Sequence, residues 1–172
     1  ERCGDGVPAH LLGQRVAAIT RFGGYAELAI TDHRAVVPIP ENVALATACA
    51  LTTQGVTAWY MATIARPLRA GERVLVHSAA GGVGHLLVQI AAHRGCEVIA
   101  IASGAEKARF LRGLGARHVI DRAQGDYAQQ VHALLQDARP QVSFNAVGGS
   151  TFRKDLTLLG ATGALLIYGG AE

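Results

Sequence analysis

Hydrophobic positions in the second half of the chain follow two alternating periods. Short apolar runs of strand length occupy residues 98–102, 118–120, 142–146 and 164–168. Between them, apolar residues recur at helical spacing in residues 105–114, 127–135 and 152–159. Strands separated by helices of this length predict right-handed βαβ units, and therefore an α/β fold with a doubly wound parallel sheet.

The first third of the 172-residue chain has a different pattern. Apolar or alternating runs predict strands at residues 15–19, 25–30 and 35–39, and helices follow at residues 44–53 and from Gly55 to the Arg66-Pro67 pair. We expect residues 1–45 to be part of a small β-rich domain and residues 46–172 to form the α/β domain. The chain starts in a loop-like stretch and stops two residues after a Gly-Gly turn, so we also expect a longer parent protein.

A glycine-rich turn lies between the first strand of the α/β part and its first helix, predicted at residues 86–93. The run from Val74 to Gly84 is an apolar strand followed by His-Ser-Ala-Ala-Gly-Gly-Val-Gly. In the dinucleotide fingerprint G-x-G-x-x-G, Ala79 takes the first glycine position, and Gly81 and Gly84 take the second and third. Such a turn aims the positive end of a helix dipole at one point, which suits a pyrophosphate. The sequence therefore predicts a dinucleotide site.

The residues after the next two strands indicate which dinucleotide. Folds of this kind that bind NAD carry a carboxylate about 20 residues after the turn, and here that position is Ser103. Lys107 follows in the next helix, and Arg122 follows the third strand. Donors and positive charge suit a 2′-phosphate, whereas NAD needs an acceptor, so Ser103, Lys107 and Arg122 predict NADPH. The alternative is that Lys107 and Arg122 are ordinary solvated charges.

Composition excludes several other classes of protein. Half of the residues are hydrophobic, and the net charge is +3. The 16 basic residues are scattered and form no stripe beside aromatic side chains. We therefore expect no nucleic-acid partner. No apolar run reaches the roughly 18 residues of a membrane span, so we expect no membrane partner and no targeting segment. Three scattered cysteines suggest no disulfide framework and favour a cytoplasmic location.

Several motifs together resemble one family. They are residues 77–84, the run from Gln54 to Ala58, residues 115–121, the run from Asn145 to Gly149, and Tyr168-Gly169-Gly170. In order and spacing they are similar to the zinc-independent quinone oxidoreductase and enoyl reductase branch of the medium-chain dehydrogenase/reductase superfamily. The resemblance runs from about Gly13 to the last residue. It implies a Rossmann nucleotide domain, truncated at its C-terminal end, preceded by part of a GroES-like catalytic domain.

The resemblance also implies roles for individual residues. Thr57 would contact the nicotinamide end of the cofactor, and Ser103, Lys107 and Arg122 would hold the 2′-phosphate. Many relatives carry tyrosine where this chain has Arg122. The pyrophosphate would lie on Ala80, Gly81, Gly82 and Val83. The ribose and carboxamide region would be lined by Asn145, Val147 and Tyr168. No catalytic residue can be named.

The activity implied by the resemblance is hydride transfer from NADPH to a quinone, an enone or an α,β-unsaturated thioester, without a metal. The acceptor would be a small molecule, with a carrier-protein-bound thioester as one form, and the intact protein would be a homodimer. One alternative is an enoyl reductase domain inside a polyketide or fatty-acid synthase. An alternative of another class is a domain that binds NADPH without turnover, as a sensor or structural part.

Two rival chemistries depend on single residues. A catalytic zinc ligand would fall near Ala50, which cannot bind metal; Cys49 is adjacent, but we expect it to be a small buried residue. His77, at the end of the first strand, could act as an acid or base, but a buried and hydrogen-bonded histidine is the simpler expectation. No Tyr-x-x-x-Lys pair is present, which excludes a short-chain dehydrogenase.

Overall fold

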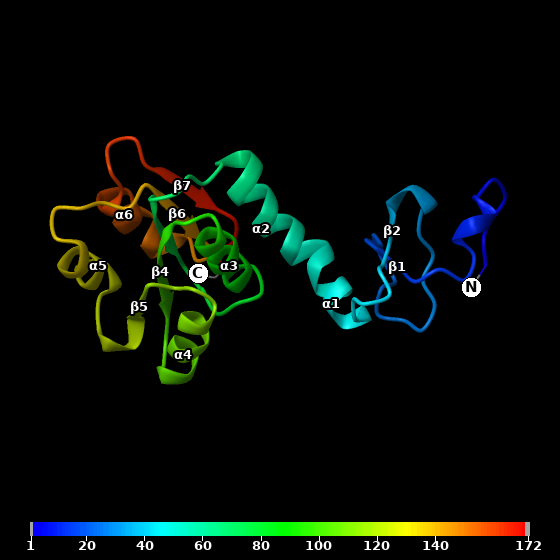
Figure 1. Ribbon diagram of the computed structural model, residues 1–172, viewed down its shortest axis with the longest axis horizontal. Helices are drawn as coiled ribbons and strands as arrows, with labels where there is room; N and C mark the ends of the chain where they lie inside the picture. The colour runs from blue at the N-terminus through cyan, green and yellow to red at the C-terminus, as the bar shows by residue number, and fades with distance from the viewer. Residues whose placement is uncertain (1, 171–172) are drawn as a thin grey trace. The chain divides into compact units, whose positions relative to one another are not determined.

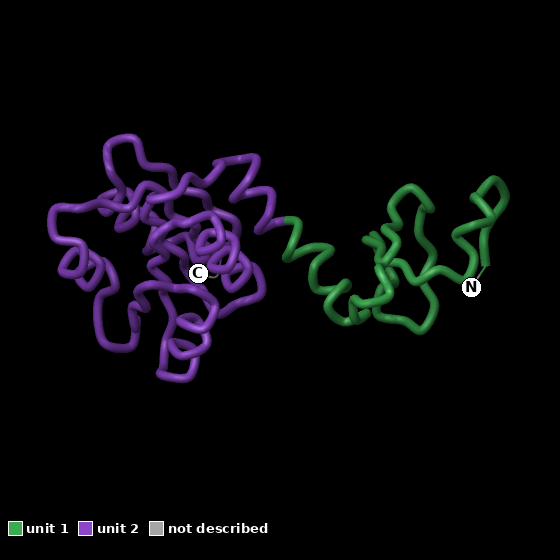
Figure 2. The backbone as a smooth tube through the Cα atoms, in the orientation of Figure 1, with its two compact units in different colours: residues 1–56 green, residues 57–172 purple. Residues whose placement is uncertain are grey.

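The computed structural model describes residues 2–170 (Figure 1). Two compact units make up the chain, residues 1–56 and residues 57–172 (Figure 2).

The first unit is built around a short antiparallel ribbon. Strand β1 (Val16–Ala18) pairs with β2 (Val36–Pro38), with Val16 opposite Pro38 and Ala18 opposite Val36. The remaining elements of this unit are two 3₁₀ turns, η1 (Ala9–Leu11) and η2 (His33–Ala35), helix α1 (Leu45–Ala50) and a π-helical stretch, η3 (Leu51–Gly55). The guanidinium of Arg15 donates hydrogen bonds to the carbonyls of Pro40, Glu41 and Val43, and these contacts fix the chain that leads into α1.

Two expectations for this unit are wrong. Residues 25–30 form no strand, and Tyr25, Leu28 and Ile30 are exposed. A strand needs a neighbour that takes up its backbone hydrogen bonds, and β1 and β2, the strands of this unit within residues 2–56, pair with each other instead. Cys49 is exposed on α1 rather than buried. Ala48 beside it turns inward on that helix.

The second unit contains the predicted parallel sheet. Its strands are β3 (Arg73–Val76), β4 (Glu97–Ala102), β5 (His118–Asp121), β6 (Val142–Asn145) and β7 (Ala164–Ile167). All four neighbouring pairs are parallel, in the order β5-β4-β3-β6-β7. The strand order reverses between β3 and β6, which is where doubly wound sheets open a crevice for ligands. The α/β fold class is confirmed.

Helices cover both faces of this sheet (Figure 1). They are α2 (Val56–Tyr60), continued by the π-helical η4 (Met61–Ala65), and then α3 (Gly84–His93), α4 (Ala105–Gly113), α5 (Tyr127–Leu135) and α6 (Gly149–Leu158), with a 3₁₀ turn, η5 (Arg122–Gln124), before α5. The predicted helix at residues 152–159 therefore begins three residues early. Its first turn is Gly149-Ser150-Thr151, residues that the sequence pattern alone reads as loop.

Alternate residues of β3, β4 and β5 enter two separate cores, as a pleated strand requires. Val74, Val76 and Phe144 pack against Leu87 and Val88 of α3 on one face. On the other face, strand residues of β3, β4 and β5 pack against α5 and α6; the buried members are Leu75, Ile99, Ile101, Ile120, Tyr127, Val131 and Leu158. Burial of each large aliphatic or aromatic side chain contributes about 1.5–3 kcal/mol. The two cores hold the carboxyl ends of the strands in fixed positions.

Candidate functional site

The glycine turn after β3 depends on very close packing. Ser78 has φ +46°, a left-handed conformation that few residues other than glycine adopt. Its carbonyl oxygen accepts a hydrogen bond from the Gly81 N–H at 2.8 Å. A Cβ atom at Gly84 would lie 2.3 Å from that same oxygen, so only glycine fits where α3 begins. The Ala79 N–H donates to the Ile101 carbonyl at 3.0 Å, which ties the turn to the end of β4.

A cavity of about 260 Å³ opens beside this turn, at the carboxyl ends of β4 and β5. It brings together five of the residues predicted to bind the cofactor, and three further residues complete it. The lining residues are Ser78, Ala80, Gly81, Ile101, Ala102, Ser103, Lys107 and Arg122. Sequence reasoning missed Ser78, Ile101 and Ala102. Parallel strands place the segments that follow them at the same edge of a sheet, so the two ends of β4 and β5 meet here.

The charge of this cavity is positive. Lys107 and Arg122 are its charged lining residues, and no carboxylate lines it. Asp121 is the acid next to Arg122, but its Oδ1 accepts hydrogen bonds from the N–H groups of Ala123, at 3.0 Å, and Gly104, at 3.4 Å. The Asp121 carboxylate is therefore hydrogen-bonded to the local backbone, and the polar side chains that line the cavity are two serines and two cations.

The remaining predicted residues lie outside that cavity. Gly82 and Val83 complete the glycine turn, and Thr57 is half-buried on α2. Asn145 and Val147 are buried at and just beyond the end of β6, and Tyr168 follows β7. The Tyr168 N–H donates to the Asn145 carbonyl at 3.0 Å, so these last residues share the carboxyl edge of the sheet beyond β3.

Tyr168 carries a polar atom that has no hydrogen-bond partner among residues 2–170. Its hydroxyl is buried and, within residues 2–170, is the one buried side-chain nitrogen or oxygen without a hydrogen-bond partner. Burial raises the pKa of the Tyr168 hydroxyl to about 12, so it stays protonated and can donate. An unsatisfied buried hydroxyl costs about 1–3 kcal/mol. A ligand group that accepted this hydrogen bond would recover part of that cost.

A buried polar cluster lies beneath the turn. Asp155 of α6 is fully buried and accepts hydrogen bonds from His77, Tyr127, Ser143 and Asn145. Burial raises the pKa of the Asp155 carboxyl, but the hydrogen bonds from His77 and its other partners outweigh that effect, so its pKa lies below the ordinary value. Burial and the nearby Asp155 charge raise the pKa of the Tyr127 hydroxyl.

His77 is buried and hydrogen-bonded, as expected, with its Nε2 atom 3.0 Å from Oδ1 of Asp155. Sequence reasoning missed Asp155, Tyr127 and Ser143. The available signal was Asp155 itself, which shares a helix face with Leu158 at the helical spacing of three residues.

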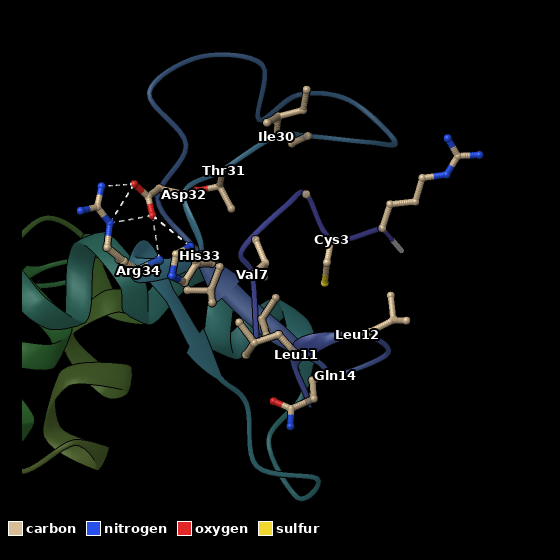
Figure 3. A pocket seen from close by; sticks show the side chains of 15 residues that line it. Cys3, Val7, Leu11, Leu12, Gln14, Ile30, Thr31, Asp32, His33 and Arg34 are labelled. Atoms are coloured by element: carbon tan, nitrogen blue, oxygen red, sulfur yellow. Dashed lines mark hydrogen bonds and ion pairs between the residues drawn. The ribbon is translucent and has the colours of Figure 1, made fainter. Parts of the chain in front are cut away.

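A larger cavity, of about 800 Å³, lies in the first unit and contains none of the predicted residues. Figure 3 shows its lining, with Val7 and Leu11 on one side and the segment from Ile30 to Arg34 on the other. Its carboxylate, Asp32, is held by the Arg34 guanidinium at 2.5 Å, and this contact lowers the pKa of Asp32. The charges of Asp32 and Arg34 therefore neutralise each other within this cavity.

Metal and membrane signatures are both missing from the part of the chain that the structure describes. Residues 2–170 contain no group of three or more His, Cys, Asp or Glu side chains placed to hold a metal ion. No helix among them has the length and apolar character that a membrane crossing demands.

Comparison with known proteins gives consistent relatives. The profile of the family described as zinc-binding dehydrogenase matches residues 82–172. The chain is 33% identical to the quinone oxidoreductase of Pseudomonas aeruginosa over 173 residues, which cover all of this chain and 53% of that protein. It is also 32% identical to a mycocerosic acid synthase-like polyketide synthase of Mycobacterium tuberculosis, over 96% of this chain and 8% of the synthase.

The fold has equally clear counterparts among solved structures. A mycobacterial protein solved in complex with NADPH is similar with a TM-score of 0.87 and 33% identity, over 98% of this chain and 53% of that one. This chain thus spans about half the length of the quinone oxidoreductase and of the mycobacterial protein. It belongs to the zinc-binding dehydrogenase family, within the quinone oxidoreductase and enoyl reductase branch of the medium-chain dehydrogenase/reductase superfamily.

Proposed function

We propose that this chain is the cofactor-binding part of an NADPH-dependent reductase that passes hydride to a quinone, an enone or an enoyl thioester. In this proposal residues 46–172 form the cofactor domain and residues 1–45 belong to the catalytic domain. The observation that carries the proposal is the cavity beside the glycine turn, where Ser103, Lys107 and Arg122 converge without a competing carboxylate. That set of groups suits a 2′-phosphate and disfavours the bare ribose of NADH.

In this proposal, different residues of the chain bind different parts of the cofactor. The turn of Ala80, Gly81, Gly82 and Val83, at the N-terminus of α3, offers N–H groups and dipole charge to the pyrophosphate. The Ser103 hydroxyl and the two cations hold the phosphate on the adenosine side. Beyond the turn, Thr57, Asn145, Val147 and Tyr168 face the nicotinamide side, and the unsatisfied Tyr168 hydroxyl donates a hydrogen bond there.

When bound, the cofactor supplies a hydride from C4 of its nicotinamide. The task of the protein is to hold that ring in one orientation, which removes the orientational entropy cost before the chemical step. With a thioester acceptor, hydride would go to the β-carbon and a proton to the α-carbon. We propose that the reaction needs no metal, because Ala50 stands where a catalytic zinc ligand would fall.

The relatives support two classes of acceptor. One is named a quinone oxidoreductase, and another, 31% identical over the whole of this chain, is the 2-haloacrylate reductase of a Burkholderia species. Quinones and acrylates share a carbon–carbon double bond that is polarised by a carbonyl or carboxyl group. An enoyl reductase domain is the second candidate, favoured by the similarity to one segment of a polyketide synthase. The homodimer, the carrier-bound substrate and the cytoplasmic location stay predictions.

The test is NADPH oxidation by the intact protein, with a quinone and a crotonyl thioester assayed side by side. Faster turnover of the quinone would identify a free-standing oxidoreductase, and faster turnover of the thioester an enoyl reductase. Tight NADPH binding without turnover of either acceptor would contradict the reductase and leave the binding-only alternative.

A further inference from the structure

One buried carboxylate collects hydrogen bonds from three separate parts of the second unit. Oδ1 of Asp155 accepts from His77 Nε2 at 3.0 Å and from the Tyr127 hydroxyl at 2.8 Å. Its Oδ2 accepts from the Ser143 hydroxyl and from Asn145 Nδ2, each at 2.7 Å. Two carboxylate oxygens offer about four lone-pair positions, so this acceptor is saturated.

Two of these donors are attached to the loops that flank the crevice of the sheet. His77 directly precedes Ser78, whose left-handed conformation starts the glycine turn. The His77 ring is further held edge-on by the Tyr127 ring, at 5.0 Å between centroids and 83° between planes. Fixing this side chain fixes the backbone from which the turn departs.

The second tie reaches the loop after β6. While Asn145 Nδ2 donates to Asp155, its Oδ1 accepts from the N–H groups of Val147 and Gly148, both at 2.9 Å. The Asn145 side chain is fully buried, and both its amide nitrogen and its amide oxygen are hydrogen-bonded. The orientation of its amide is set by Asp155 together with Thr151, whose hydroxyl oxygen accepts from the same Nδ2 at 2.9 Å, and the loop conformation depends on that amide.

We propose that Asp155 is a positioning residue that holds the loop after β3 and the loop after β6 in register with each other. This inference rests on the proposed function, since those loops would carry the pyrophosphate and the nicotinamide end of NADPH. The cavity of Ser103, Lys107 and Arg122 lies at the ends of β4 and β5. The donors to Asp155 are His77, Tyr127, Ser143 and Asn145, and none of them lines this cavity. Asp155 thus fixes the two loops directly, whereas Ser103, Lys107 and Arg122 are placed by the ends of β4 and β5 and share only the glycine turn with them.

An amide is a poorer partner for these donors than the carboxylate. In Asp155→Asn, one of the two acceptor oxygens becomes an NH₂ group. At the Oδ2 position this group faces the Asn145 amide, which can accept only by releasing Val147 and Gly148. At the Oδ1 position it faces the Tyr127 hydroxyl, which can rotate to accept, and His77, which can accept only in the tautomer that carries its proton on Nδ1. The substitution keeps the shape of the side chain, but it removes the charge and weakens the hold on at least one of the two loops.

The test compares two ligands on the intact protein and its Asp155→Asn variant. NADPH spans both halves of the site, whereas adenosine 2′-phosphate occupies only the cavity of Lys107 and Arg122. We expect the variant to lose about tenfold or more in NADPH affinity, the effect of one charged hydrogen bond, and to bind adenosine 2′-phosphate within roughly threefold of the wild type. Hydrogen exchange without ligand provides a second readout, with faster exchange expected at the Val147 and Gly148 amides.

Two further variants separate positioning from general stability. Asp126→Asn removes another acid that links α5 to α6, through its ion pair with Lys154, and it contacts neither loop. It should leave NADPH affinity unchanged. If Asp155→Asn does not fold, His77→Phe cuts only the tie to the glycine turn, because a phenyl ring has the shape of the imidazole but no nitrogen to donate. It should weaken NADPH binding while the Val147 and Gly148 amides keep their protection.

The outcomes distinguish this inference from the proposed function. Equal losses for NADPH and adenosine 2′-phosphate, or unchanged NADPH affinity and unchanged protection in Asp155→Asn, would overturn the positioning role while the proposed function stood. Failure of the wild-type protein to bind NADPH would overturn both.

Discussion

A Cβ atom on Gly84 would lie 2.3 Å from the carbonyl oxygen of Ser78 and 2.8 Å from the Cα atom of Ala79. Both neighbours are backbone, and the Ser78 carbonyl is already bonded to the Gly81 N–H. Neither can move without opening the turn that leads into α3. The third glycine of the fingerprint is therefore required by packing, whatever ligand the turn binds.

Gly84→Ala should destabilise the protein by about 1–3 kcal/mol, the usual cost of forcing a methyl group into a filled space. Chemical denaturation of the intact protein measures this directly. Gly113→Ala is the matched control, because Gly113 ends α4 with no atom within 4 Å of an added Cβ and with a φ that any residue can adopt. That change should be neutral or slightly stabilising. Equal losses in the two variants would contradict the packing argument.

Lys107→Glu should weaken NADPH binding by about 10- to 100-fold and leave NADH within roughly threefold, since one charged contact to a phosphate is lost. Arg109→Glu reverses an exposed charge on the same helix, and Arg109 does not line the cavity. It should change neither affinity much. Calorimetry with both cofactors on both variants measures these affinities. Equal losses of NADPH and NADH in Lys107→Glu would remove Lys107 from the phosphate site.

Ser103→Asp places a carboxylate where NAD-binding relatives of this fold have one. The change should reverse the preference, because the new acceptor suits ribose hydroxyls and repels a 2′-phosphate. The measurement is the ratio of NADH to NADPH affinity in the variant and the wild type. A ratio that does not rise would show that Ser103 lies away from the ribose.

Tyr168→Phe should have opposite effects on the stability of the free protein and on its affinity for NADPH. Without ligand, loss of the unsatisfied hydroxyl should raise the free energy of unfolding by about 1 kcal/mol. With NADPH present, the same loss should weaken binding, because the hydrogen bond donated to the cofactor disappears. Urea unfolding and a binding titration on one pair of proteins give both numbers. Unchanged NADPH affinity would place the Tyr168 hydroxyl outside the cofactor site.

The low pKa of Asp155 makes stability depend on pH in one direction. A carboxyl group whose pKa in the folded protein lies below its ordinary 3.8 stabilises the fold fully above that value, and this contribution is lost as pH falls further. His77 and Tyr127 are the titratable groups in contact with it. The free energy of unfolding of the wild type should therefore decrease as the pH falls below about 4. Asp155→Asn should lower stability at pH 7 and flatten that acid-side slope. A slope unchanged by the substitution would assign the acid sensitivity to other carboxylates.

Sequence alone predicted the sheet and the cation cavity for one shared reason. Ser103 and Arg122 each follow a strand, and the carboxyl ends of neighbouring parallel strands meet, so a linear pattern translates directly into proximity. The strand expected at residues 25–30 failed because pairing depends on a neighbour that local alternation does not reveal. Asp155 was missed because its partner His77 is 78 residues away, and no spacing rule links them.

The most direct test of the account is the pair of dissociation constants for NADPH and NADH on the intact protein, measured at one salt concentration. A cavity that holds a 2′-phosphate between Ser103, Lys107 and Arg122 predicts that NADPH binds at least about tenfold more tightly. Equal affinities, or tighter binding of NADH, would contradict the assignment of this cavity.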